Sequence, residues 1–408
     1  MSIDPTSAKV IQPLDVDYDA IRSSNPHRMV HGVEARLIRL RQQVINVWTA
    51  VQAYRSPAGI RAVIARLKEH RALASGGKRV VKLVSAAGRN HWRLFIPANT
   101  SPLHVPFLKG ELNRLVPHSR GGHELAVVFL SVTKKCPLKC EHCFEWDNLN
   151  QKEVIGPEDI NHMIENLQSM GATNIAFTGG EPMLRVREMA ESIRRYKSKS
   201  QFWILTSGFN FTAANAAELR SAGAHGVVVS IDHYDPLAHD QFRGTKGSFR
   251  DAITAVKHAL DQGYLTAIST CVTRENANRE YIDAFMDLAK SLGVGFVQWI
   301  EPKAVGHYAM QDVLLKPEHQ AVLEEALLDY TYMDAYKDHP LVIYHEYYQR
   351  KLGCFAAGNK MVYVDTDGDL MSCPFCHRKG GSLLGDDFRQ SLENLRTAGC
   401  SDYGPVMV

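Results

Sequence analysis

The sequence lacks any run of about 18 consecutive apolar residues, although 45% of its 408 residues are hydrophobic. A helix needs a stretch of that length to cross a bilayer, so no transmembrane helix is expected. The start of the chain, MSIDPTSAKVIQPLDVDYDA, also lacks the basic and apolar segments of a signal peptide. Both absences predict a cytoplasmic protein.

The chain contains no low-complexity tract, and its cysteines number eight. The composition is ordinary for a soluble globular protein, and the length suits two or three domains. In a reducing cytosol, clustered cysteines more often bind metal than form disulfides. The clustered cysteines are therefore candidate metal ligands.

The net charge of +3 conceals an asymmetry between the two ends of the chain. Residues 1–120 contain 19 Lys and Arg against 7 Asp and Glu, whereas the remainder contains 28 against 37. Such a split predicts a basic N-terminal module that meets an anionic partner, such as an acidic peptide or nucleic acid, or a membrane surface. The alternative is a solvated helical face that packs on the rest of the protein. A peripheral position at a membrane is therefore an alternative within the cytoplasmic expectation.

The basic segment predicts two helices and a hairpin. Residues 33–56 form the first helix, with Arg36, Arg39 and Arg41 largely off one apolar face. That face consists of Val33, Leu37, Leu40, Val44, Val47, Trp48 and Val51. The second helix covers 56–75, with Ser56 as N-cap and Pro57 at its first position. Residues 78–98 read as a hairpin around Ala86-Ala87-Gly88.

From about residue 124, short apolar strands alternate with helices. The predicted strands are 125–132, 174–180, 201–208, 226–232, 265–273 and 295–302. The predicted helices are 157–170, 185–197, 212–223, 248–262 and 278–292. This alternation predicts an α/β fold, a partial (β/α)6 barrel of TIM type, which binds ligands at the carboxyl ends of its strands.

Four parts of the chain follow from these patterns. A basic, mainly helical α+β module occupies residues 1–120, and the barrel occupies 121–305. A helical connector covers 306–350. A small cysteine-containing module covers 351–408, with a hairpin that turns at Asp367-Gly368.

Three cysteines, Cys136, Cys140 and Cys143, lie within eight residues directly after the first predicted strand. Three thiolates on one loop can hold three corners of a [4Fe–4S] cluster and leave one iron open. A structural zinc site would want four ligands, usually starting from a Cys-x2-Cys pair. The loop therefore indicates a cluster with an open iron, with a zinc knuckle as the alternative.

The Cys-x3-Cys-x2-Cys loop resembles the motif of the radical S-adenosylmethionine (SAM) enzymes, with His142 at its aromatic position. The resemblance implies that the open iron binds the amino and carboxylate groups of SAM. It also implies that His142 and Phe144 lie beside this cofactor.

The stretch TGGEP, which ends the second predicted strand, is similar to the GGE motif of that family. The resemblance implies that its backbone and Glu181 receive the SAM ammonium group. Physically, Gly179 and Gly180 let the main chain approach a ligand closely, and a carboxylate suits a cation.

The residues from Ser230 to Phe249 resemble a further family stretch, S-x-D followed by H-D, R-G and G-S-F. Ser230 and Asp232 point the same way on a strand and are expected to contact SAM. Arg243 is expected to pair with the SAM carboxylate. The alternative is that Asp232 caps a turn and Arg243 forms a surface ion pair.

Two later strands depart from the family pattern or add little to it. The fifth predicted strand lacks the glycine-rich adenine contact of some members, and Cys271 reads as a small buried hydrophobe. On the sixth strand, Trp299 or Ile300 is expected to line the adenine.

A second cysteine group follows in the tail. The spacing Cys354-x13-Gly368-x4-Cys373 resembles the start of the SPASM and twitch extensions, which carry auxiliary [4Fe–4S] clusters. With Cys376 and Cys400 the group has four thiols, which implies one auxiliary cluster. His377 or an open position is the alternative to Cys400, and a zinc ribbon is the alternative to the cluster.

The resemblance implies a radical SAM oxidoreductase or maturase. Reductive cleavage of SAM would give a 5′-deoxyadenosyl radical that abstracts hydrogen from a peptide or a small molecule. The implied partners are that substrate and a reductant such as flavodoxin or ferredoxin; no catalytic side chain is assigned. The alternatives are an iron–sulfur electron carrier without SAM chemistry and a zinc-based binding module.

Overall fold

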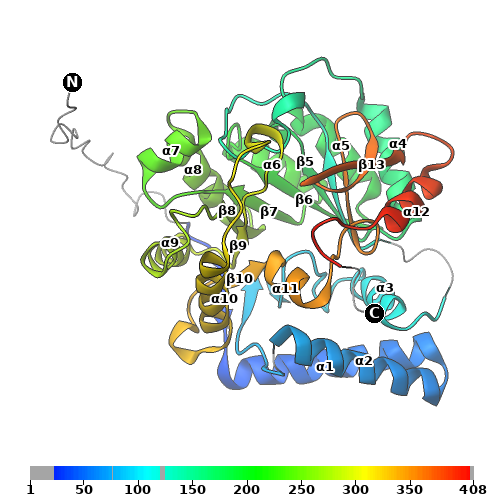
Figure 1. Cartoon of the computed structure of the whole chain (residues 1–408). Coiled ribbons are helices and arrows are strands. Elements are labelled where there is room, and N and C mark those ends of the chain that lie inside the picture. The colour runs from blue at the N-terminus through cyan, green and yellow to red at the C-terminus, as the bar shows by residue number, and fades with distance from the viewer. Residues whose placement is uncertain (1–22, 76, 120–124, 405–408) are drawn as a thin grey trace, which may run out of the picture.

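The protein, a computed structural model described over residues 23–75, 77–119 and 125–404, is built on one large twisted sheet (Figure 1). Seven consecutive parallel strands form most of it, each hydrogen-bonded to the next along the chain. They are β4 (Val127–Ser131), β5 (Asn174–Thr178), β6 (Gln201–Thr206), β7 (Gly226–Ser230), β8 (Leu265–Cys271), β9 (Phe296–Ile300) and β10 (Leu341–Tyr344). The first and last of these strands do not pair, so the barrel is partial, and the predicted α/β fold class is confirmed.

Helices connect the parallel strands and cover the sheet. They are α4 (Pro157–Ser169), α5 (Val186–Tyr196), α6 (Ala213–Ala222), α7 (Pro236–Arg243), α8 (Ser248–Asp261), α9 (Arg279–Leu292) and α10 (Pro317–Tyr332). Local signals set their ends. The Thr212 and Asn278 side chains accept hydrogen bonds from first-turn N–H groups, and Gly223 and Gly293 adopt left-handed conformations after the last turn. The five predicted helices are therefore present, and α7 is additional.

The core lies on both faces of the sheet. On the outer face, residues such as Phe177 and Ile204 pack against the helices. On the inner face, Trp203 and Phe296 pack against Val84 and Phe95 of the N-terminal module. Parallel sheets need such double cover because their strands are apolar on both sides. The N-terminal module thus closes the amino-end side of the barrel.

Over its described residues, the N-terminal module contains a three-stranded antiparallel sheet and three helices. Its elements are β1 (Arg28–Val30), α1 (Gly32–Tyr54), α2 (Pro57–Ser75), β2 (Leu83–Ala86), β3 (Arg89–His91) and α3 (His104–Leu115). The predicted hairpin forms, with positive φ at Ala87 and Gly88, and Ser56 accepts a hydrogen bond from the Gly59 N–H at 3.1 Å. Residues 1–22, which lack the basic and apolar segments of a signal peptide, lie outside the described residues.

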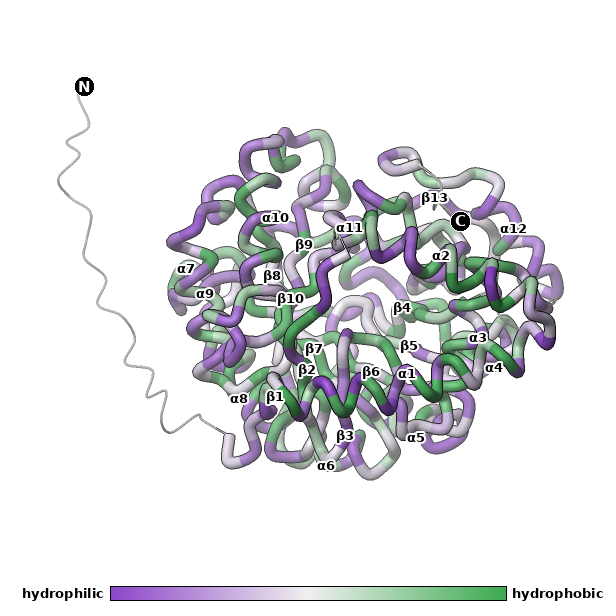
Figure 2. The backbone as a smooth tube through the Cα atoms, turned by 90° about the horizontal axis from the view of Figure 1, so that it is seen from below, coloured by the Kyte–Doolittle hydropathy of each residue, from purple (hydrophilic) through white to green (hydrophobic). Residues whose placement is uncertain are grey.

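Helix α1 forms as predicted, but its apolar face does not enter the core. All seven apolar residues from Val33 to Val51 named above are between 47% and 70% exposed. Its buried residues are Ala35, Thr49 and Ala50. In the view from below, α1 runs across the near face of the molecule (Figure 2).

The tail continues the main sheet. Its elements are α11 (His345–Leu352), β11 (Met361–Val364), β12 (Asp369–Cys373), β13 (Cys376–Ser382) and α12 (Phe388–Ala398). Strand β11 pairs in parallel with β4 and antiparallel with β12, so the predicted hairpin at Asp367-Gly368 is present. Residues 306–350, expected to be a helical connector, also supply β10. The four domain boundaries stay a prediction, because one sheet joins three of the parts.

Candidate functional site

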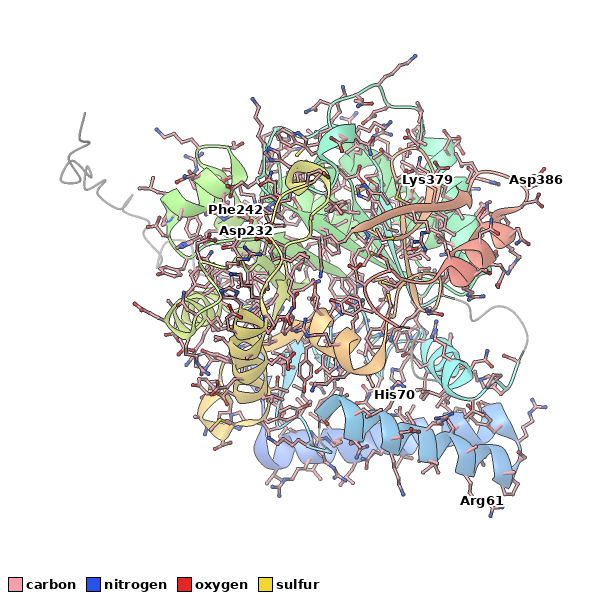
Figure 3. The ribbon with its side chains drawn as sticks, viewed as in Figure 1. Arg61, His70, Asp232, Phe242, Lys379 and Asp386 are labelled. Carbon is pink, nitrogen blue, oxygen red and sulfur yellow. The ribbon has the colours of Figure 1, made fainter. Side chains whose placement is uncertain are left out.

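The motifs singled out in the sequence meet at the carboxyl ends of the parallel strands. The cysteine loop follows β4, the stretch TGGEP ends β5, and Asp232 follows β7. This edge is where ligands bind in open α/β sheets. In Figure 3, Asp232 and Phe242 mark this site, well separated from Arg61 of α2.

The backbone of the cysteine loop is held from two sides. The Lys139 and Glu141 N–H groups donate to the Arg243 and Phe242 carbonyls at 3.2 and 2.9 Å. Across the loop, the His307 N–H donates to the Cys143 carbonyl at 2.9 Å. Segments from α7 and from the loop after β9 therefore fix the path of the cysteines.

An aromatic stack closes this part of the site. The His307 ring lies flat on Trp146, with centroids 3.8 Å apart, and its Nδ1 lies 3.1 Å from the Cys140 carbonyl. Trp146 belongs to the short helix η1 (Trp146–Asn148). Sequence reasoning assigned no role to this pair, because the two rings are far apart in the chain.

The three thiols are poorly solvated. Burial raises the pKa of Cys136 and of Cys143 to about 12, and it also raises that of Cys140 against the effect of Arg243. Thiolates in such a place require positive charge, which iron ions would provide. The donor set therefore fits three corners of a [4Fe–4S] cluster.

Arg243 and Asp232 form a buried ion pair, with Nε and Oδ2 2.5 Å apart. Arg243 also donates to the Cys140 Sγ at 3.6 Å. Burial alone would raise the pKa of Asp232, but the charge of Arg243 outweighs this effect and holds that pKa below its usual value. Burial alone would lower the pKa of Arg243, but the charge of Asp232 outweighs it and raises that pKa. The pair is therefore no surface ion pair, and it connects the end of β7 to the cysteine loop. Ser230, the last residue of β7, is half-buried.

Asp232 is also fixed by its neighbours. Its Oδ1 accepts from the Cys271 N–H at 2.8 Å, and its own N–H donates to His239 Nδ1 at 3.1 Å. The Tyr281 hydroxyl donates to its carbonyl at 2.7 Å. Contact of Ser230, Asp232 and Arg243 with SAM stays a prediction.

The two glycines of TGGEP bring β5 against the cysteine loop. A Cβ on Gly180 would lie 2.2 Å from the Lys135 carbonyl oxygen, and one on Gly179 would lie 2.6 Å from that of Thr133. The Gly180 and Glu181 N–H groups donate to these two carbonyls, at 2.7 Å to Thr133 and 2.8 Å to Lys135. Glycine is therefore required here for contact with the loop itself.

The Glu181 carboxylate is buried and accepts four hydrogen bonds. The donors are the Met183 N–H at 3.1 Å, the Thr206 hydroxyl at 2.7 Å, and the N–H and hydroxyl of Ser207 at 2.9 and 2.5 Å. Burial raises the pKa of Glu181, although these bonds oppose the shift. Four donors fill the acceptor capacity of a carboxylate, so Glu181 ties β5 to β6. Its contact with the SAM ammonium stays a prediction.

The two aromatic positions of the loop face different parts of the molecule. His142 stacks on Phe242, with centroids 4.8 Å apart, and burial lowers its pKa to about 4. Phe144 packs edge-on against Tyr363 and Phe375 of the tail. Phe144 therefore connects the first cysteine loop to the second cysteine group.

Trp299 does not face the interior of the barrel. It is buried in the core between the sheet and the outer helices, with Tyr344 as a neighbour, whereas Phe296 on the same strand belongs to the inner core. Strand residues alternate between faces, so Ile300 lies on the face opposite to Trp299. The expected adenine contact of Trp299 does not suit this placement, and of the two candidates Ile300 fits better.

The second cysteine group assembles from three segments of the tail. Cys373 and Cys376 face each other across β12 and β13, Cys354 follows α11, and Cys400 follows α12. Burial raises the pKa of Cys354 and of Cys373 to about 12, and Cys400 adds to both shifts. The four thiols are thus neighbours, whereas His377 is exposed and its ring lies 3.1 Å from the Pro374 carbonyl.

Neither group is arranged around one ion. In the part of the chain that the structure describes, no three His, Cys, Asp or Glu side chains are placed to bind a single metal ion. A cubane cluster distributes its thiolates over different irons.

Among the helices of the described residues, none has the length and apolar character that a membrane span requires.

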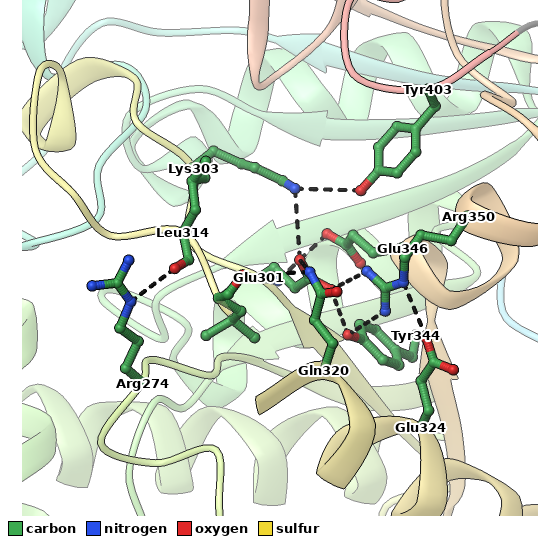
Figure 4. Close-up of polar contacts among 11 residues, drawn as sticks. Arg274, Glu301, Lys303, Leu314, Gln320, Glu324, Tyr344, Glu346, Arg350 and Tyr403 are labelled. Atoms are coloured by element: carbon green, nitrogen blue, oxygen red, sulfur yellow. Dashed lines mark hydrogen bonds and ion pairs between the residues drawn. The ribbon is translucent and has the colours of Figure 1, made fainter. Parts of the chain in front are cut away.

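Sequence reasoning missed a buried polar network beside β9 and β10 (Figure 4). Arg350 donates to Glu301 Oε1 at 2.6 Å and to the Tyr344 hydroxyl at 2.8 Å, and Tyr344 also donates to Glu301. Burial raises the pKa of Glu346 to about 7, although Lys303 opposes the shift. The position of Glu301 directly after a strand was the one available signal.

This network borders a cavity of about 580 Å³. Its lining includes Glu301, Lys303, Gln349, Asp402 and Tyr403. Gln349 Nε2 lies 3.8 Å from Cys354 Sγ. The cavity therefore lies beside the second cysteine group.

Residues 130–289 match the family model described as the Radical SAM superfamily. Two curated relatives are both named AdoMet-dependent heme synthase. The protein of Oleidesulfovibrio alaskensis is 29% identical over 42% of this chain and 44% of its own length. That of Nitratidesulfovibrio vulgaris is 28% identical over 44% of this chain and 48% of its own length. The match thus spans less than half of each relative.

Solved structures share the fold at low identity. Streptococcus suis SuiB bound to S-adenosylmethionine has a TM-score of 0.53 and 15% identity over 74% of this chain and 71% of its own. Native anSMEcpe with bound AdoMet has a TM-score of 0.52 and 19% identity over 66% of this chain and 82% of its own. SuiB bound to its precursor peptide SuiA has a TM-score of 0.52 and 14% identity over 65% of this chain and 64% of its own.

Proposed function

On the premise that this chain is a radical SAM protein, with the family domain at residues 130–289, we propose that it is an enzyme that cleaves SAM reductively. A [4Fe–4S] cluster held by the three cysteines would, when reduced, supply the electron that cleaves SAM to methionine and a 5′-deoxyadenosyl radical, which would take hydrogen from the substrate. The observation that carries the proposal is the loop of three poorly solvated thiols at the carboxyl edge of the sheet. The family match and that loop together support SAM-dependent radical chemistry.

The residues of the chain have distinct roles in this proposal. Cys136, Cys140 and Cys143 hold the cluster, and Arg243 donates to one of these thiolates while Asp232 balances its charge. Gly179 and Gly180 bring the end of β5 close to the loop, where its backbone can meet the SAM amino group. His142 and Ser230 stand beside the SAM site.

We assign the second cysteine group to one auxiliary [4Fe–4S] cluster held by Cys354, Cys373, Cys376 and Cys400. Their proximity supports this assignment over His377 as the fourth ligand. Phe144, which contacts Tyr363 and Phe375 of the tail, supports a substrate position between the two clusters.

The proposed substrate is a peptide or a small molecule, and the proposed electron donor is flavodoxin or ferredoxin. The precursor peptide in the SuiB structure supports a peptide substrate. The name of the heme synthases supports a small-molecule substrate. An anionic partner of the basic N-terminal module is also proposed.

Iron content tests the cluster assignment. Anaerobically reconstituted protein is expected to bind about eight irons, the sum for two [4Fe–4S] clusters. Replacing Cys136, Cys140 and Cys143 with Ala should leave about four irons and abolish SAM cleavage, measured as 5′-deoxyadenosine formed.

The matched control replaces Cys354, Cys373 and Cys376 with Ala and should keep the first cluster with its SAM cleavage. Zinc in place of iron at either group would contradict the assignment there. Full iron without SAM cleavage in the wild-type protein would favour an electron carrier.

A further inference from the structure

The exposed stripe of α1 is a feature that the proposed chemistry does not use. Its apolar residues recur at three- and four-residue steps along the helix, at positions 33, 37, 40, 44, 47 and 51. A surface helix normally turns such a face to the core. Here the small residues Ala35 and Ala50 face the protein instead, and the large side chains face solvent. A stripe of this length on a soluble surface marks an interaction site.

The stripe lies at the end of the molecule opposite to the cysteine loop. The N-terminal module packs on the inner core through Val84 and Phe95, at the amino-end side of the strands, whereas the cysteines follow their carboxyl ends. Helices α1 and α2 form its outer layer (Figure 1), and Arg61 of α2 points away from the barrel (Figure 3). A partner on this layer would leave the mouth of the barrel open.

The surroundings of the stripe are strongly basic. Residues 23–75 contain nine Lys and Arg but only two acidic residues, Glu34 and Glu69. Both acidic residues are already paired, with Arg28 at 2.6 Å and with Arg66 at 3.0 Å. Within the described residues, the remaining cations of the two helices have no carboxylate partner. They are Arg36, Arg39, Arg41, Arg55, Arg61, Lys68 and Arg71.

We propose that α1 docks with its apolar face on the surface of an anionic lipid bilayer. An apolar stripe containing Trp48, bordered by arginines without acidic partners, is the pattern of a helix that lies in the membrane interface. Charge complementarity selects this occupant, because a second copy would oppose the same excess of positive charge. The proposal is independent of the chemistry at the cysteine loop.

Vesicle binding by the full, cluster-containing chain tests the proposal. The protein should bind vesicles of phosphatidylglycerol and phosphatidylcholine but not vesicles of phosphatidylcholine alone, and added salt should weaken binding. The double variant Val44→Asp with Val47→Asp should bind at least about tenfold more weakly. The matched control is Val154→Asp, because Val154 is equally an exposed valine but lies outside α1. This control should bind as the wild type does.

A second measurement reports the depth of α1 directly. Brominated lipid should quench part of the tryptophan fluorescence, and Trp48→Phe should remove that quenchable part. SAM cleavage should be unchanged in the α1 variants, so failure here and failure of the proposed function are distinguishable.

Three outcomes would overturn the proposal. The first is equal binding of the wild type and the double variant to anionic vesicles. The second is a dimer that the double variant converts to a monomer, without vesicle binding, which would mean that a second copy covers the stripe. The third is binding to polyglutamate but not to vesicles, which would mean that an acidic polypeptide is the partner.

Discussion

The Arg243 side chain interacts with two neighbouring groups. Its guanidinium lies between the Asp232 carboxylate and the Cys140 sulfur, and all three groups are buried. A buried charge that loses its partner is costly, because neither water nor another group compensates it. The position of Arg243 therefore affects both the fold and the cysteine loop.

We expect Arg243→Ala to lower the free energy of unfolding by about 3–5 kcal/mol, because it leaves the buried Asp232 carboxylate without its ion-pair partner. Iron at the first site should fall as well, measured after anaerobic reconstitution. The double variant Arg243→Ala with Asp232→Asn is the control and should recover part of the stability. Equal urea midpoints for the wild type and Arg243→Ala would contradict this account.

The pKa of the buried Glu346 carboxyl is raised, whereas that of the buried Asp232 carboxyl is lowered. Burial raises its pKa to about 7, above the value for an unfolded chain, so the folded state retains a proton that the unfolded state has lost. Stability should therefore decrease as pH rises from about 4.5 to about 7. Glu346→Gln removes this titration, so its free energy of unfolding should depend less on pH over that range. Urea unfolding at both ends of the range measures the difference, and parallel pH profiles would refute it.

At the scale of elements, the end of β5 shows why a short motif requires its residue types. Gly180 packs directly on the main chain that precedes Cys136, and Glu181 anchors the same turn to β6. The motif thus positions the cysteine loop through contacts within the protein itself.

Gly180→Ala is expected to destabilise the protein by about 1–3 kcal/mol and to reduce iron at the first site, because its Cβ would overlap the Lys135 carbonyl. Gly404→Ala is the matched control, since a Cβ there would have no atom within 4 Å. Thermal unfolding and iron content measure both effects. A Gly180→Ala protein with full iron and unchanged stability would show that the loop can move aside.

At the scale of the whole molecule, the tail and the barrel share one sheet. Strand β11 pairs with β4, Lys134 forms an ion pair with Asp367 at 2.6 Å, and the Tyr363 hydroxyl donates to Glu145. The tail therefore covers the edge of the strand that precedes the cysteine loop. An uncovered edge strand promotes aggregation.

A chain ending at residue 350 should consequently lose stability and aggregate, rather than retain an intact barrel. The control is Cys373→Ser with Cys376→Ser, which alters the second cysteine group but keeps β11. Soluble yield and urea midpoints compare the two proteins. A soluble, cooperatively folding truncated chain would support an independent barrel domain.

The order of most strands and helices, and the place of both cysteine groups along the chain, followed from local sequence patterns. Hydrophobic periodicity and short-range spacing carry this information, because a strand, a helix turn or a three-cysteine loop depends on residues close in the chain. The predicted hairpins at Gly88 and Gly368 belong to the same class, since a turn needs only its own residues.

Which faces and which distant groups meet became clear from the packing of the folded chain. Periodicity shows that α1 has an apolar face but not where that face points, and it does not place Trp299 on the outer side of β9. Strand β10 has four residues and a weak local signal, and Arg350 reaches Glu301 across 49 positions. Such contacts depend on how the whole sheet closes and on which side chains must share buried charge, and neither is a property of a local stretch of sequence.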